Sequence, residues 1–381
     1  MSRWTGASQT NEMTAHKCIG AAALALCLAI PAMAQTAPPP APPPTAWKLG
    51  PVDVSGMVDA YYGLGFNRPA GHVSLLRAFD DKANQVELNM ASITLDYAPQ
   101  PIGFHLDAGV GRAFDIMSAT EKNATGMRFF KQAYISVKPS SWKGVEFDFG
   151  RFVSFASAEL IETPNNGNYS RSLLFFWCTP SYHFGMQVKA PIGAHFNAGA
   201  QWVAGWSNIV TGATYRTVGL TGAWTISKAT WTNTYYGGPD ENKADRGMRN
   251  LWDSVLVLNP RPKISVYLNF DYLHNSPRLT PGYRIYGLAG AAKFQLTKKL
   301  ALSPRLEWMN DESGRVTGAA QRLKEFTLTG TYAFAERLSG WLEFRNDWSN
   351  QPCFNRGSQL GNWKTQPTLL VGMVAIIRPA K

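Results

Sequence analysis

The sequence contains no run of 18 apolar residues, although 45% of its 381 residues are hydrophobic. A membrane-spanning helix needs about 20 consecutive and mainly apolar residues, so no segment of this chain suits one. Charged residues are scarce at 17%, whereas aromatic residues reach 12%. The hydrophobicity is spread along the chain in alternation with polar residues instead of being concentrated in blocks.

Cysteines are also few, and motifs of enzymes are missing. Of the four cysteines, only Cys178 and Cys353 lie outside the N-terminal 34 residues, and no C-x-x-C is present. The sequence has no G-x-S-x-G, H-E-x-x-H or P-loop, and its histidines stand in unrelated contexts. We therefore predict no catalytic residues, no metal site and no cofactor. In an oxidising compartment the two cysteines could pair, and the sequence leaves this open.

The positive charge does not indicate a nucleic-acid partner. The net charge is +11, but there is no basic cluster, zinc knuckle or recognition-helix pattern. The N-terminus points to export instead, because Lys17 precedes the short apolar run IGAAALALCLAI and an A-x-A site ends at Ala34. We predict a cleaved signal peptide at 1–34, a proline-rich periplasmic tether at 35–47 and one remaining domain at 48–381.

The stretch Val52–Phe66, VDVSGMVDAYYGLGF, alternates apolar even positions with polar odd ones such as Asp53 and Asp59. Similar segments of about ten residues recur, the length at which a tilted strand crosses a bilayer. They include 104–112, 144–150, 182–190, 195–202, 263–272, 300–308, 325–334 and 338–347. Short turns and long polar loops connect them alternately, and this spacing predicts about sixteen strands. A change of parity near Ala91 indicates a bulge.

A strand with one apolar and one polar face suits a wall between lipid and water. No water is available in a bilayer core to pair backbone groups, so such a sheet has to close. We predict an all-β fold, a transmembrane antiparallel up-and-down barrel, with aromatic residues such as Trp308 and Trp348 at the membrane interfaces. The charged residues predicted to line its lumen are Asp53, Asp59, Asp107, Glu146, Asp148, Lys189, Asp271, Arg305, Glu307, Glu343 and Arg345. A soluble β-sandwich is the competing fold.

The longest loop, the third one, lies within 150–180 and contains the apolar run Leu173–Trp177. A loop surrounded by water would not carry such a run, so we predict that this loop folds inward onto the barrel wall. An external packing contact is the alternative.

The same region contains a series of short motifs, which are Gln132-Ala133-Tyr134, Gly150-Arg151-Phe152, Ala158-Glu159, Ile161-Glu162-Thr163, Asn168-Tyr169-Ser170-Arg171-Ser172, Leu174-Phe175, Pro180, His183 and Gly185. In these residues the sequence resembles the OmpL-like β-barrel porin-2 family. They span about 55 residues, and the remaining chain matches only in rhythm. The resemblance implies an outer-membrane porin in which small hydrophilic solutes or ions diffuse passively, and it brings no catalytic residues.

The motif would place Glu159, Glu162 and Arg171 at a pore constriction, where opposed charges select solutes by charge and size. Alternatively, Glu162 and Arg171 only hold the loop together. Arg151 would join the constriction only if a bulge or the strand end turned it inward.

Outer-membrane lipid, lipopolysaccharide and small solutes are the expected partners, and a homotrimer follows from analogy alone. A plugged barrel acting through its external loops is the alternative function, and a barrel enzyme is a remote one. Net charge does not decide the ion preference, because the predicted lumen is rich in acids.

Overall fold

The computed structural model describes residues 47–377 except 120, 122–125, 208–215, 240–246 and 278–280. The predicted signal peptide and nearly all of the predicted tether lie outside these residues. The tether's last residue, Trp47, begins a short strand, β1 (Trp47–Leu49), which pairs with β2. The strands of the main sheet are β2 (Val52–Gly65), β3 (Val86–Tyr97), β4 (Ile102–Val110), β5 (Phe130–Val137), β6 (Glu146–Val153), β7 (Tyr182–Ile192), β8 (Phe196–Val203), β9 (Thr217–Ile226), β10 (Ala229–Pro239), β11 (Met248–Arg261), β12 (Ile264–Ser276), β13 (Tyr283–Gln295), β14 (Leu300–Asp311), β15 (Gln321–Ala335), β16 (Leu338–Ser349) and β19 (Thr365–Ile377).

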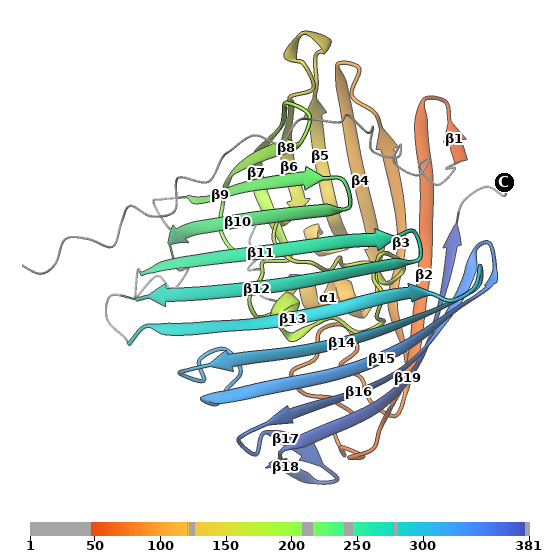
Figure 1. Cartoon of the computed structure of the whole chain (residues 1–381), viewed down its shortest axis with the longest axis vertical. Coiled ribbons are helices and arrows are strands. Elements are labelled where there is room, and N and C mark those ends of the chain that lie inside the picture. Colours follow the sequence, from red (N-terminus) through yellow and green to blue (C-terminus); the bar gives the residue numbers. More distant parts are fainter. Residues whose placement is uncertain are drawn as a thin grey trace, which may run out of the picture. The chain divides into compact units, whose positions relative to one another are not determined.

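These sixteen strands form a closed antiparallel barrel (Figure 1). Each strand pairs with its neighbours in the chain, and the last strand, β19, pairs with the first, β2, so no edge is left open. The predicted fold class and strand number are confirmed. Because the number of strands is even, both ends of the barrel chain lie at the end of the barrel that carries the short turns. None of the helices in the described part of the chain is long and apolar enough to span a membrane.

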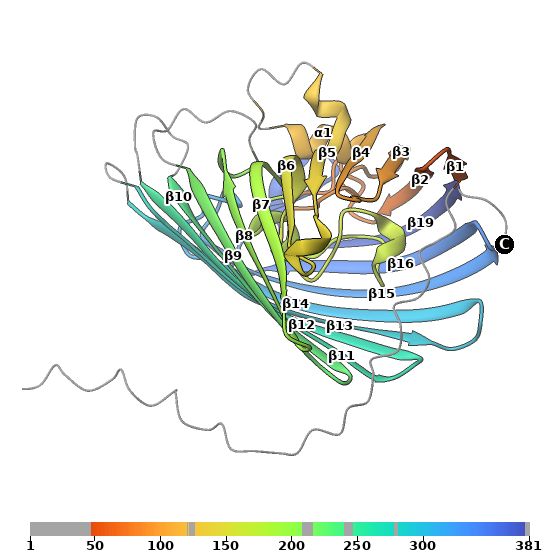
Figure 2. The ribbon, with the colours of Figure 1, turned by 90° about the horizontal axis from the view of Figure 1, so that it is seen from above.

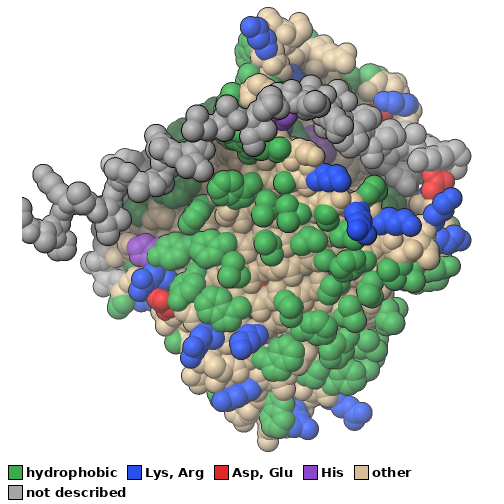
Figure 3. Space-filling view, in the orientation of Figure 1, with side chains coloured by type: hydrophobic (Ala, Val, Ile, Leu, Met, Phe, Trp, Pro, Cys, Tyr) green, Lys and Arg blue, Asp and Glu red, His purple; other side chains and the backbone are tan. Residues whose placement is uncertain are grey.

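The strands alternate in exposure as the sequence predicts. In β14, Leu302 and Leu306 are exposed, whereas Ser303, Arg305 and Glu307, at the alternate positions, are buried. A broad area of hydrophobic side chains covers the outer surface seen in Figure 3, and Lys and Arg gather toward its rims. An apolar belt of this kind suits contact with hydrocarbon, because the paired backbone leaves only side chains to face it.

The connections follow the predicted alternation of short turns and long loops. The turns between β9 and β10 and between β15 and β16 take two residues each, 227–228 and 336–337. The bulge predicted near Ala91 lies two residues away at Asn89, because Asp59 pairs with Met90 while Ala60 pairs with Leu88. The loops also contain elements that alternation did not predict: helix α1 (Arg112–Ser118) and the hairpin β17 (Phe354–Arg356) and β18 (Gln359–Trp363).

Candidate functional site: the third loop and the wall charges

The segment 154–181, which we call the third loop, joins β6 to β7 and contains the short helix α2 (Leu173–Trp177). The hydroxyl of Ser172 caps α2 by accepting a hydrogen bond from the Phe175 amide at 3.1 Å. Glu307 on β14 accepts hydrogen bonds from the amides of Leu173 at 2.6 Å and Leu174 at 2.7 Å. A wall carboxylate therefore satisfies two amides at the start of this helix, which have no partner inside it.

The apolar side of α2 explains why a polar loop carries the run LLFFW. Leu173 and Leu174 are almost fully buried against apolar side chains of the wall, which are Tyr236, Leu251, Leu273, Ile285, Met309 and Leu323. Phe175 packs in a second cluster with Phe79, Met90 and Trp341. The strands that α2 contacts are β13 and β14, and Figure 2 shows the yellow-green coil of this loop within the ring of strands. The wall residues that it contacts alternate with the exposed apolar residues, so they belong to the opposite face of the sheet.

Arg171 organises the loop from within. Its guanidinium donates to the backbone oxygens of Leu160 at 2.7 Å and Ile161 at 3.0 Å, and also to that of Tyr169. Burial lowers the pKa of Arg171, and the nearby carboxylates of Glu159 and Asp59 act in the opposite direction. Only 2% of the side chain is exposed. These contacts favour the interpretation in which Arg171 holds the loop together.

Glu159 connects the loop to the wall through Arg305 on β14. Nη1 of Arg305 lies 2.7 Å from Oε1 of Glu159, and its Nε lies 2.9 Å from Oε2 of Glu325. Arg305 also donates to the backbone oxygen of Ser170 at 2.7 Å. Burial alone would raise the pKa of Glu159, but the guanidinium groups of Arg305 and Arg171 outweigh it and hold the pKa below its ordinary value. The carboxylate is therefore ionised and paired.

Two further wall carboxylates hold the tip of the loop. Glu343 on β16 accepts from the amides of Tyr169 at 2.7 Å and Ser170 at 3.1 Å. Asp59 on β2 accepts from the hydroxyls of Thr163 and Tyr169, each at 2.6 Å. Burial, followed by the adjacent Asp59, raises the pKa of the Tyr169 hydroxyl well above its ordinary value, so this group remains a donor. Arg345 on β16 in turn donates to the backbone oxygen of Arg171 at 2.6 Å.

Glu162 is attached to the barrel on another side. Its carboxylate pairs with the ammonium of Lys131 on β5, which also contacts Asp107 on β4. Lys131 was not singled out from the sequence. It sits at a bulge, since Asp107 pairs with Gln132 while Ala108 pairs with Phe130, and the extra residue turns to the same face as Gln132. A break in the alternation of apolar and polar residues within 130–134, FKQAY, is the only sequence signal that could have revealed it.

Arg151 lies apart from this cluster. Its Nη1 is 2.6 Å from Oε1 of Glu121, and its guanidinium carbon lies 3.6 Å from the centre of the Tyr182 ring. Arg151 pairs in register with Ala133 and Phe184. It lies an odd number of residues from the inward-facing Asp148, so alternation directs it to the other face of the sheet. Among the described residues, its partners thus belong to the connection between β4 and β5 and to β7. The side chain is not brought to Glu159, Glu162 and Arg171.

The remaining predicted wall charges form smaller groups. Lys189 on β7 bridges Glu146 at 2.7 Å and Asp148 at 2.9 Å on β6. Asp53 pairs with Lys48, and Asp271 on β12 lies opposite Asp253 on β11 in register. Within the described residues, no group of three or more His, Cys, Asp or Glu side chains is arranged to hold a metal ion.

Cys178 and Cys353 are both free thiols that belong to the same apolar cluster. Burial raises the pKa of Cys353 to about 11, whereas Cys178 is completely buried. We expect maleimide to label Cys353 about 100-fold more slowly at pH 8 than an ordinary thiol, because only the thiolate reacts. The rate should rise about tenfold per pH unit up to pH ~11. Labelling reactions quenched at set times and analysed by mass spectrometry test this. Cys353→Ser should abolish the slow labelling, whereas Cys178→Ser should leave its rate unchanged.

Comparison with known proteins agrees with this architecture. The chain matches the family described as "Putative beta-barrel porin-2, OmpL-like" over residues 51–377. No curated protein sequence matches it. Among solved structures, the anion-selective porin from Comamonas acidovorans has a TM-score of 0.62 at 11% identity, with 86% of this chain and 99% of that chain covered.

A second similar structure is OmpT of Vibrio cholerae expressed in the outer membrane, with a TM-score of 0.57 at 11% identity and coverage of 87% of this chain and 99% of that chain. The trimer form of in-vitro folded OmpT has a TM-score of 0.56 at 11% identity, with 85% and 98% covered. At these identities the likeness establishes the fold, whereas the family match spans nearly the whole barrel. The chain belongs to the OmpL-like β-barrel porin-2 family and is an outer-membrane porin that forms a channel.

Proposed function

We propose that the third loop crosses the lumen of this porin and narrows it to a charged constriction through which small hydrophilic solutes diffuse. The observation that carries this proposal is the position of the two anchors. Glu162 pairs with Lys131 on β5, and Glu159 pairs with Arg305 on β14. These two strands are nearly opposite in the circular strand order. A loop attached to both sides of a barrel leaves passage only along the remaining wall.

The remaining opening favours anions in this proposal. A hollow of about 190 Å³ lies between the loop and β11–β13, and its lining includes Asn166, Asn168, Tyr267, Glu159 and Lys293. Glu159 is buried and paired with Arg305, whereas Lys293 is partly exposed and has no carboxylate partner among the described residues. The ammonium of Lys293 is thus the free charge at the narrow section, and such charges weigh most on permeation. The similar fold of an anion-selective porin agrees with this preference.

Replacing Lys293 by glutamate is expected to reverse the ion preference. For the purified wild type in a planar bilayer under a salt gradient, the reversal potential should have the sign of an anion-selective channel. Lys293→Glu should give the opposite sign, with single-channel current steps of similar size. The matched control is Lys299→Glu, which makes the same charge change in an exposed turn and should leave the sign unchanged. If Lys293→Glu kept the original sign, the selective section would lie elsewhere.

The loop contacts also support one competing function, a barrel plugged at this level. Asp59 and Arg305 are 0% exposed, so these two wall charges face the loop and not water in the lumen. A folded protein that never conducts would favour this plugged barrel, which acts through its external loops. The family and the fold are those of a channel and not of an enzyme. For the assembly we propose a homotrimer, in line with the trimer form of the similar OmpT.

A further inference from the structure

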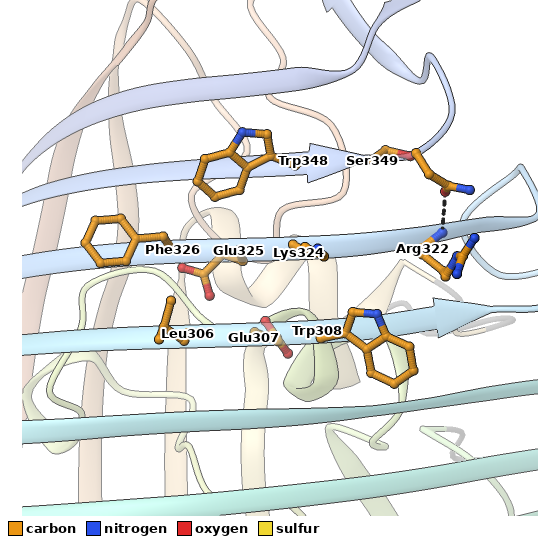
Figure 4. A pocket seen from close by; sticks show the side chains of 10 residues that line it. Leu306, Glu307, Trp308, Arg322, Lys324, Glu325, Phe326, Trp348 and Ser349 are labelled. Carbon is orange, nitrogen blue, oxygen red and sulfur yellow. Dashed lines mark hydrogen bonds between the residues drawn. The ribbon is translucent and has the colours of Figure 1, made fainter.

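An open hollow of about 770 Å³ lies on the outer surface over β14, β15 and β16 (Figure 4). At its centre is one row of three residues on adjacent strands. Lys324 on β15 pairs in register with Trp308 on β14 and with Trp348 on β16. Directly opposed side chains in a sheet stand about 5 Å apart at their β-carbons, so the lysine is flanked in its row by one tryptophan on each neighbouring strand.

The rows above and below differ in polarity. One row nearer the long loops, Arg322 is exposed and pairs with Asn310 and Asn350. One row nearer the middle of the barrel, Phe326 pairs with Leu306, which is 64% exposed. Along β15 the outer surface therefore changes from cationic, through aromatic, to apolar within about five residues. The headgroup region of a bilayer changes in the same order, and Trp side chains favour that level.

The two cations lack local compensation. The hollow is also lined by Glu307 and Glu325, but these are only 5% and 1% exposed and their carboxylates serve the third loop and Arg305 on the other face. Among the described residues, neither Arg322 nor Lys324 forms an ion pair. Two unpaired cations thus stand at the rim of an apolar surface that faces lipid, where a lysine or arginine keeps its head near the interface while its stem covers apolar groups.

We propose that this hollow binds a phosphorylated lipid of the membrane leaflet on the long-loop side. Lys324 and Arg322 contact the phosphate, Trp308 and Trp348 flank the headgroup, and an acyl chain lies over Leu306 and Phe326. Cations near an anionic lipid surface attract it, and the arginine fork suits a phosphate in particular. The occupant is a lipid and not free phosphate, because the surface continues directly into the apolar belt.

Native mass spectrometry of the intact barrel, released from micelles that contain diphosphoryl lipid A, tests the proposal. The wild type should retain the lipid, and the variant R322Q/K324Q should bind it about 30-fold more weakly. The matched control, K298Q/K299Q, removes two exposed cations from the turn at the other end of the barrel and should bind like the wild type. Heat-modifiable migration in detergent gels verifies that each variant is folded.

Three results would overturn the proposal. The first is equal lipid retention by R322Q/K324Q and the wild type. The second is equal binding of lipid A from which the phosphates have been removed, since the cations would then play no part. The third is displacement of the lipid by an excess of inorganic phosphate, because the hollow would then be a site for a free anion.

Discussion

Replacing Arg305 by alanine is expected to release the third loop from the barrel wall. Arg305 is fully buried and bonds to Glu159 and Ser170 of the loop and to Glu325 of the wall. Without it, the buried carboxylates of Glu159 and Glu325 each lose the guanidinium that lies nearest to them. Removing one member of a buried ion pair costs about 3–5 kcal/mol because the remaining charge is left uncompensated. Water entering from the lumen relieves this cost most readily if the loop detaches.

Trypsin provides the measurement, because the loop contains Arg171, whose side chain is 2% exposed. Cleavage after Arg171, followed by mass spectrometry of the peptides, should be at least about 100-fold faster in Arg305→Ala than in the wild type. Arg305→Lys keeps the positive charge but loses the forked N–H donors of the guanidinium, so an intermediate cleavage rate is expected. Arg261→Ala at an exposed strand end is the control and should leave the rate unchanged. Equal protection in all variants would mean that Arg305 does not hold the loop.

The barrel itself could be predicted from the sequence because its cause is local. A strand between lipid and a polar interior must alternate apolar and polar residues, and this alternation is visible in the sequence of Val52–Phe66 and of 300–308. Helix α1 and the hairpin β17–β18 could not be found in this way, since a helix of seven residues or a three-residue strand is too short to produce a period. Their stability comes from contacts that are distant in the sequence.

The candidate site was predictable only in part. Alternation assigns Arg305, Glu307, Glu343 and Arg345 to the polar face of their strands. In the structure all four are buried in contact with the third loop or its wall partners, and the partners of a loop cannot be deduced from alternation. One local irregularity changed the set of charged residues, because the bulge at Lys131 brought in a cation that strict alternation would exclude. Arg151, in contrast, keeps the regular alternation and pairs with Glu121.

Shortening the third loop should have the largest effect on conduction. Replacing residues 157–178 by a short glycine–serine linker removes both anchors, Glu159 and Glu162, together with α2. The wall charges that the loop buried, such as Arg305 and Glu307, would then face water in the lumen, which can solvate them. We therefore expect the barrel to fold and its conductance to increase several-fold. Shortening the hairpin β17–β18 at 355–361 is the matched control and should leave the conductance unchanged.

The single-channel current in a planar bilayer, recorded for the wild type and for this shortened variant, tests the central claim most directly. Stable steps in the wild type, and clearly larger steps in the variant, are the result that a channel narrowed by its third loop predicts. Steps of equal size would contradict the constriction. A correctly folded wild type that never conducts, beside a conducting variant, would show that the loop closes the barrel instead of narrowing it.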